Sequence, residues 1–240
     1  MTDFVFLHGG GQGGWVWDET VAALHAQSGG AHRVLALDGP GCGAKRGRGS
    51  SALTFDAITA ELVADIEAAG FSDVVLVGHS QAGIHMPPML AARPGLFRQL
   101  IFVTCTAPDP GLTVVQMTGE RVHKGGHPFN DASLSVRERY RSMFCNDMGE
   151  AEAEAFLDKL GPDQWPACCY SQSEWQHDHL RDVPVSYVLC LQDSILPLEW
   201  QEHFARTVHA RSTPRIDAGH QVMNTRPQAL AEVLLAECAV

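Results

Sequence analysis

The sequence predicts an α/β fold in which a mainly parallel, six-stranded sheet is flanked by helices. Short apolar runs rich in β-branched residues alternate with segments of helical pattern, as in successive strand–helix–strand units. The chain has 240 residues, of which 45% are hydrophobic and 19% are charged, so it can bury a substantial core. One long stretch breaks the alternation, and we expect it to form a separate helical layer.

Six apolar runs are the strand candidates, and five helical patterns separate or follow them. The strands are expected over residues 4–8, 33–37, 74–77, 100–104, 186–191 and 214–216, and the helices over 17–27, 55–69, 81–93, 198–207 and 227–238. Thr54 suits the N-cap of the second helix, with Asp56 in its first turn. Pro87 and Pro88 fall inside the third helix, and we expect a kink or break there because proline removes a backbone hydrogen bond.

The stretch from 109 to 181 is too long for a simple loop, and it contains two helical patterns near 135–144 and 150–160. We expect this stretch to form a helical cap inserted between two strands of a core made of residues 1–108 and 182–240. Ligands of open α/β sheets bind at the carboxyl ends of the strands. The cap is therefore expected to lie over that end of the sheet.

The most informative motif is Gly78-His79-Ser80-Gln81-Ala82-Gly83, which directly follows the apolar run 74–77. A strand that ends in a sharp turn around one serine is typical of a nucleophile elbow, here with Ala82 where glycine is more common. Small residues are needed around the serine because the strand and the following helix approach closely. The motif predicts that Ser80 is a nucleophile.

A serine nucleophile needs a histidine base, and the base needs a carboxylate. His220 lies in the loop after the last strand candidate and is the expected base. Asp193 ends the preceding strand and is the expected acid, with Asp109 as its main rival. The chain order serine, aspartate, histidine is that of the α/β-hydrolases.

The glycine-rich loop from His8 to Trp15 suits an oxyanion hole, because glycines let backbone N–H groups approach a developing negative charge. We expect the two donors to be the backbone N–H groups of Gly10 and Gln81. The loop lacks the lysine and hydroxyl residue of a phosphate-binding P-loop, and it lacks the spacing of a dinucleotide fingerprint. No metal or organic cofactor is expected.

On these motifs the chain resembles the α/β-hydrolase superfamily, and within it the plant methylesterase and hydroxynitrile lyase group with its bacterial esterase relatives. The lyases of that group carry threonine after the first-loop histidine and lysine after the catalytic histidine. Here Gly9 and Gln221 stand at those positions, so the resemblance implies a hydrolase. Cys42 departs from the histidine or serine common in the group, and we expect a packed thiol there rather than a substrate contact.

The expected function is hydrolysis of a small or medium carboxylic ester through an acyl-enzyme intermediate. Three alternatives stay open: a hydroxynitrile-lyase-like reaction, carbon–carbon bond hydrolysis, and a ligand-binding or receptor protein on the same scaffold. Apolar cap residues are expected to contribute to the substrate pocket, although any one of them can instead belong to the core of the cap. The candidates are Met117, Phe129, Met143, Phe144 and Trp165.

Composition and net charge indicate which classes of binding partner and which location to expect. The formal net charge of −11 disfavours nucleic acid and anionic membrane surfaces. The sequence shows no secretory signal pattern, and its seven cysteines are an odd set, so we expect reduced thiols in a cytoplasmic protein. The expected partner is a small-molecule ester. The sequence leaves the oligomeric state open, with a homodimer among the alternatives.

Overall fold

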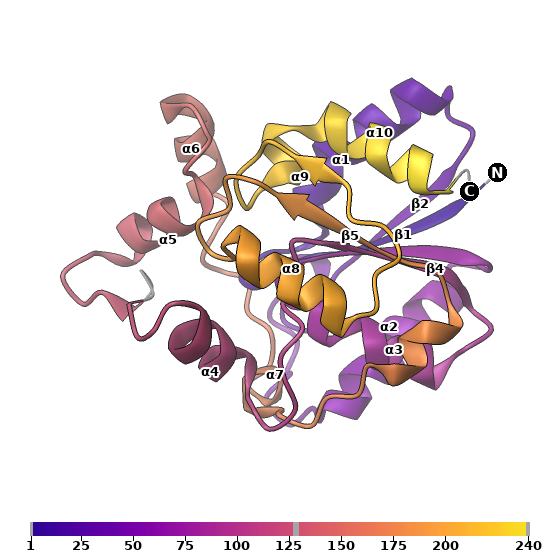
Figure 1. The fold of residues 1–240 in the computed structure, drawn as a ribbon, viewed down its shortest axis with the longest axis horizontal. Coiled ribbons are helices and arrows are strands. Elements are labelled where there is room, and N and C mark those ends of the chain that lie inside the picture. The colour runs from indigo at the N-terminus through magenta and orange to yellow at the C-terminus, as the bar shows by residue number, and fades with distance from the viewer. Residues whose placement is uncertain (1, 127–129, 239–240) are drawn as a thin grey trace.

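The computed structural model describes residues 2–126 and 130–238, and it contains one six-stranded parallel sheet with the strand order β2-β1-β3-β4-β5-β6 (Figure 1). The prediction of a parallel six-stranded sheet flanked by helices is confirmed. The strands are β1 (Asp3–Leu7), β2 (Arg33–Leu37), β3 (Val74–His79), β4 (Phe97–Val103), β5 (Val185–Cys190) and β6 (Arg215–Ile216).

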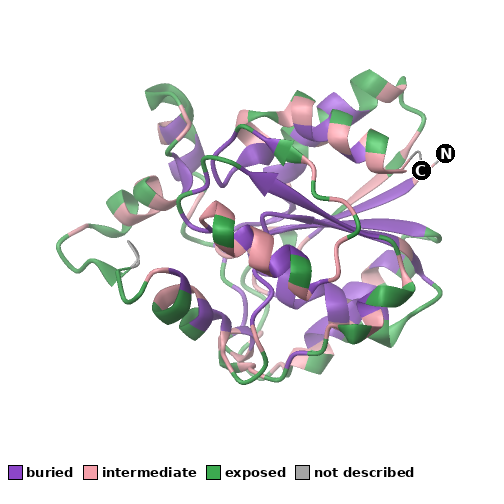
Figure 2. Cartoon of the chain, viewed as in Figure 1, coloured by how far each residue is buried: buried purple, intermediate pink, exposed green. Residues whose placement is uncertain are grey.

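Helices cover both faces of the sheet. On one face lie α1 (Asp18–Ser28), α9 (Val222–Thr225) and α10 (Pro227–Cys238), and on the other lie α2 (Phe55–Ala68), α3 (Met86–Ala92) and α8 (Leu198–Thr207) (Figure 1). The central strands are buried along their whole length because each face is covered, as Figure 2 shows. They therefore read as continuous apolar runs in the sequence.

Alternate side chains of one strand enter two separate cores. In β1, Phe4 and Phe6 pack with Leu24 of α1 and Leu230 of α10. Their neighbours on the strand face the opposite core, with residues of α2 and α8. The N-cap prediction also fits the structure, since the Thr54 side chain accepts a hydrogen bond from the Ala57 N–H.

The helix expected over 81–93 is two elements. A 3₁₀ turn covers Ser80–Ile84, and α3 begins at Met86, with Pro87 and Pro88 in its first turn. Proline is tolerated there because the first N–H groups of a helix have no partner within that helix. The break therefore precedes the prolines, and the prolines begin a new helix rather than kink a continuous one. The strand expected over 100–104 also starts earlier, at Phe97.

Between β4 and β5 the chain forms α4 (Val114–Gln116), a π-helical turn (Met117–Val122), α5 (Val136–Phe144), α6 (Glu150–Leu157) and α7 (Cys168–Ser171). Figure 1 shows α5 and α6 beyond the end of the sheet to which the strand arrows point. The division of the chain into a core and a cap stays a prediction. In the described ranges, every helix is too short or too polar to cross a lipid bilayer.

Candidate active site

The backbone at Ser80 has the left-handed conformation of a sharp turn, with φ of 53°. β3 ends one residue before it, and the 3₁₀ turn begins at it. A Cβ atom added to Gly83 would lie 2.2 Å from the Thr106 carbonyl oxygen, and one added to Gly78 would lie 2.3 Å from Met86 Sδ. The small residues of the motif thus allow the turn to pack directly against neighbouring backbone and side chains, as the sequence predicts.

The three residues of the predicted triad form one hydrogen-bonded chain. His220 Nε2 lies 2.9 Å from Ser80 Oγ, and His220 Nδ1 lies 2.6 Å from Asp193 Oδ2. Because an ionised carboxylate only accepts hydrogen bonds, Nδ1 carries the proton and Nε2 is free to accept the serine proton. The side chains of His220 and Asp193 are buried, whereas Ser80 is partly exposed.

Asp193 is held by four donors that leave its carboxylate fully hydrogen-bonded. Its Oδ1 accepts the backbone N–H groups of Ile195 and Leu196, at 2.8 and 2.9 Å. Its Oδ2 accepts the Thr104 hydroxyl in addition to His220. Sequence reasoning missed Thr104, whose only signal is its position at the end of β4.

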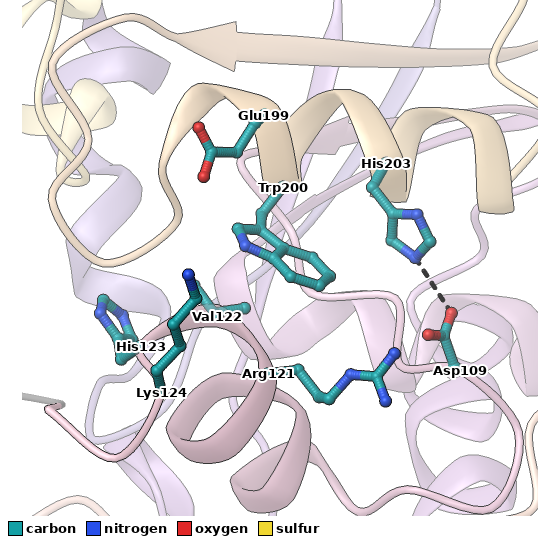
Figure 3. Close-up of a pocket in the computed structure, with 8 residues that line it drawn as sticks. All are labelled: Asp109, Arg121, Val122, His123, Lys124, Glu199, Trp200 and His203. Atoms are coloured by element: carbon teal, nitrogen blue, oxygen red, sulfur yellow. Dashed lines mark hydrogen bonds and ion pairs between the residues drawn. The ribbon is translucent and has the colours of Figure 1, made fainter.

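Asp109, the rival acid, lies in a different place. Its Oδ1 is 3.0 Å from His203 Nε2, on α8. Both residues line a cavity of about 740 Å³ together with Trp200 and Arg121, and Figure 3 shows Asp109 directed at the His203 ring. Ser80 and His220 are absent from the walls of this cavity. Asp109 is therefore engaged with another histidine.

The glycine-rich loop that begins at His8 lies directly against the turn at Ser80. A Cβ atom on Gly9 would be 3.0 Å from Ser80 Cβ, and one on Gly10 would be 2.7 Å from Gln81 Oε1. Gly10 and Gln81, the two predicted oxyanion donors, are thus brought side by side. Gly10 also leaves the space that the Gln81 side chain occupies.

Two of the five predicted pocket residues, Phe144 and Trp165, contact this centre. Phe144 of α5 lies with its ring 6.0 Å from the His220 ring, and the Trp165 indole N–H donates to the Gly9 carbonyl at 3.0 Å. Met117 is fully buried, and Met143 is partly buried against the same core. Phe129 lies outside the described residues.

A buried polar contact holds the loop that carries His220. Asp147, between α5 and α6, accepts the Gly219 N–H and the Thr225 hydroxyl, each at 2.8 Å. Its side chain is 2% exposed. Gly219, the residue before His220, is thus held in place by a side chain of the segment between β4 and β5. No sequence motif indicates this contact.

Burial keeps the His85 imidazole and the Cys42 thiol in their neutral forms. It lowers the pKa of His85 to about 3, in a ring stack between Trp165 and Phe55 with centroid distances of 4.3 and 5.1 Å. It raises the pKa of the Cys42 thiol to about 12. Cys42 is completely buried, in keeping with the packed thiol that the sequence predicts.

Residues 4–233 match the Alpha/beta hydrolase family, so the chain belongs to that family, and the predicted superfamily is confirmed. Esterase PIR7B of Oryza sativa subsp. japonica is 33% identical over 258 residues, which cover 97% of this chain and 94% of the rice protein. Carbendazim hydrolyzing esterase of Nocardioides sp. (strain SG-4G) is 31% identical over 111 residues, so this match spans about half of that relative, 45% of its length.

A solved structure shares the fold over nearly the whole chain. It is an extracellular alpha/beta-hydrolase from a Paenibacillus species, with a TM-score of 0.80 at 22% identity and coverage of 99% of each chain. That protein is described as sharing structural and functional homology with tobacco salicylic acid binding protein 2. At this level of identity the likeness shows the fold alone.

Proposed function

We propose that this protein is a serine esterase that hydrolyses small or medium carboxylic esters through an acyl-enzyme intermediate. The observation that carries the proposal is the hydrogen-bonded chain from Ser80 Oγ through His220 to Asp193. Family membership and the rice and Nocardioides esterases support a carboxylic ester hydrolase of the α/β-hydrolase type.

In the first step, Ser80 Oγ attacks the ester carbonyl carbon while its proton passes to His220 Nε2. The distance of 2.9 Å between these atoms supports direct transfer. The imidazolium that forms is stabilised by Asp193, which keeps its own negative charge. The carbonyl oxygen becomes an oxyanion, and we assign its two hydrogen-bond donors to the backbone N–H groups of Gly10 and Gln81.

Collapse of the tetrahedral intermediate breaks the bond to the alcohol oxygen, which takes the proton from His220 Nε2. Water then attacks the acyl-enzyme, with His220 again as the base, and the acid leaves with Ser80 restored. The hydrogen bonds around Asp193 support this cycle because they hold the ring in one tautomer and one orientation throughout.

The proposal is tested with a fluorophosphonate probe and a panel of p-nitrophenyl and methyl esters. We expect stoichiometric labelling at Ser80, and we expect Ser80→Ala to abolish both labelling and turnover. Retained hydrolysis by Ser80→Ala would contradict the assignment. Labelling of Ser80 without turnover of any ester would instead favour one of the three alternatives: a lyase reaction, carbon–carbon bond hydrolysis, or ligand binding on this scaffold.

A further inference from the structure

We propose that Trp165 is a positioning residue of the oxyanion hole. Its indole N–H holds the Gly9 carbonyl, and it thereby directs and strengthens the Gly10 N–H that receives the developing oxyanion. The inference rests on the proposed esterase function, in which Gly10 supplies one of the two oxyanion donors. Trp165 lies in the segment between β4 and β5, 156 residues along the chain from Gly9.

Trp165 acts on one end of a peptide group, and the oxyanion donor is the other end. The Gly9 carbonyl and the Gly10 N–H belong to the same peptide bond, which is planar and trans. The two groups of a trans peptide point in opposite directions, so a donor that fixes the carbonyl also fixes the direction of the N–H. The Trp165 indole N–H donates to the Gly9 oxygen at 3.0 Å, and this hydrogen bond is buried.

The Gly9 carbonyl is also held from within its own loop, by His8. The Gly39 N–H donates to His8 Nε2 at 3.0 Å, so the ring proton is on Nδ1. His8 Nδ1 donates it to the Gly9 oxygen at 2.8 Å, and burial lowers the pKa of His8, which favours this neutral ring. Because linked hydrogen bonds polarise one another, donors on the carbonyl make the Gly10 N–H a stronger donor.

The Gly10 N–H is free to bind a substrate oxygen beside the nucleophile. In the described part of the chain, no group accepts a hydrogen bond from it. Its neighbour Gly9 lies against Ser80, since a Cβ atom on Gly9 would be 3.0 Å from Ser80 Cβ. The N–H group that Trp165 directs is therefore next to the reacting serine.

Packing fixes the position of the indole ring. Trp165 is 3% exposed, and its ring stacks on the His85 ring with a centroid distance of 4.3 Å. A Cβ atom added to Gly39 would lie 2.4 Å from the indole, so the ring occupies the space that this glycine leaves. A ring that packing holds in this way keeps its N–H directed at the Gly9 oxygen.

A buried carboxylate two residues before Trp165 ties its segment to the chain that follows β1 and β2. Asp163 accepts the Gly43 N–H at 2.8 Å and the Arg46 Nε–H at 2.9 Å. It also accepts the Trp15 indole N–H, at 3.2 Å. The Asp163 side chain is completely buried. The backbone that carries Trp165 is therefore anchored to the same loops that the indole contacts.

The test removes the indole N–H and keeps an aromatic ring, in Trp165→Phe. The matched control is Trp175→Phe, because the Trp175 indole is also buried in the segment between β4 and β5 and donates to a carbonyl, that of Leu112, at 2.7 Å. Leu112 has no part in the proposed mechanism. We measure kcat and KM for the ester that the wild type hydrolyses fastest, with active sites counted by complete fluorophosphonate labelling.

A second measurement separates the oxyanion hole from general damage to the site. Hexyl trifluoromethyl ketone is attacked by Ser80 and forms an oxyanion, whereas hexyl methyl ketone binds as the unreacted ketone. The inhibition constants of both ketones are compared among the wild type, Trp165→Phe and Trp175→Phe. A residue that acts through the oxyanion hole affects the first ketone and leaves the second unchanged.

We expect Trp165→Phe to lower kcat about tenfold with KM within about twofold of the wild type, less than the loss for a deleted oxyanion donor, because the Gly10 N–H remains. The trifluoromethyl ketone should bind about tenfold more weakly, in step with kcat, and the methyl ketone should bind as to the wild type. Trp175→Phe should keep the wild-type kcat and both inhibition constants.

A Trp165→Phe enzyme with wild-type kcat would overturn this inference, as would equal weakening of both ketones or an equal loss of kcat in Trp175→Phe. If Trp165→Phe does not fold, benzothienylalanine at position 165 decides the outcome, because it keeps two fused rings and lacks the N–H. Absence of both Ser80 labelling and ester hydrolysis in the wild type would overturn the proposed function and this inference with it.

Discussion

At the scale of single residues, two aspartates are candidates for the acid of the triad, and their hydrogen-bond partners distinguish them. Asp193 contacts His220 at 2.6 Å, and Asp109 contacts His203 at 3.0 Å. We expect Asp193→Asn to lower kcat for an activated ester by about 10³- to 10⁴-fold, because an amide favours the wrong tautomer of His220. Steady-state kinetics with p-nitrophenyl acetate measure the loss.

Asp109→Asn is the matched control and should stay within about threefold of the wild type, since Asp109 contacts His203 rather than His220. Circular dichroism of both variants checks that they fold. If Asp109→Asn were the variant that loses three orders of magnitude, the assignment of the acid to Asp193 would be wrong.

His85 predicts a pH dependence of stability. Its pKa is about 3 in the folded protein and 6.5 in the unfolded chain, because burial in the ring stack disfavours the charged form. Below pH 6.5 the unfolded chain binds a proton that the folded protein does not, so the free energy of unfolding falls as the pH falls toward 3. The part due to His85 is about 2 kcal/mol at pH 5.

We expect His85→Phe to remove this part, since phenylalanine fits a stack between Phe55 and Trp165 and does not ionise. Guanidinium unfolding at pH 7.5 and pH 5.0 measures the difference. The exposed His25→Phe should keep the wild-type dependence on pH. A His85→Phe protein that loses as much stability as the wild type between these two pH values would contradict the prediction.

Sequence reasoning found the residues that motifs and chain order define, and the structure brings Ser80, Asp193 and His220 together. It missed Thr104 and Asp147. Each of these acts through a contact with a residue far away in the chain, and such a contact leaves no local pattern. The choice between Asp193 and Asp109 likewise depended on which histidine each side chain reaches.

At the scale of elements, Asp147 joins the segment between β4 and β5 to the loop that carries His220. Its buried carboxylate accepts the N–H of Gly219 and the Thr225 hydroxyl. We expect Asp147→Ala to lower stability by about 2 kcal/mol, because it leaves a buried N–H unpaired. We also expect a tenfold loss of kcat with little change in KM, because a displaced His220 weakens proton transfer more than binding.

The exposed Asp178→Ala is the control and should change neither quantity. Thermal unfolding and ester kinetics measure the two effects. An Asp147→Ala enzyme with wild-type kcat would show that the loop holds His220 in place without this contact.

The strands were more predictable than the helices. β1 and β3 are buried on both faces, so each is a continuous apolar run that stands out in the sequence. The prediction of one helix after Ser80 was wrong, since the structure has a 3₁₀ turn followed by a new helix. Helical periodicity in the sequence does not distinguish these two cases. The π-helical turn Met117–Val122 has no sequence signature, and its pattern was not recognised.

At the scale of the whole molecule, a single serine carries the proposed chemistry in a chain with seven unpaired cysteines. Five of these thiols are buried, and only Cys168 and Cys238 are partly exposed. Burial raises the pKa of Cys238 to about 11, so this thiol carries little reactive thiolate at pH 7. The cytoplasmic location stays a prediction, and the oligomeric state stays open.

This arrangement predicts opposite responses to two inhibitors. N-ethylmaleimide at pH 7 should leave ester hydrolysis unchanged, because a maleimide needs an accessible thiolate and none is part of the proposed mechanism. A fluorophosphonate should abolish hydrolysis by modifying Ser80. Ellman titration of the native protein should find at most two fast-reacting thiols, and guanidinium should reveal all seven. Loss of activity with N-ethylmaleimide, in step with modification of one thiol, would place a cysteine rather than Ser80 at the centre of the reaction.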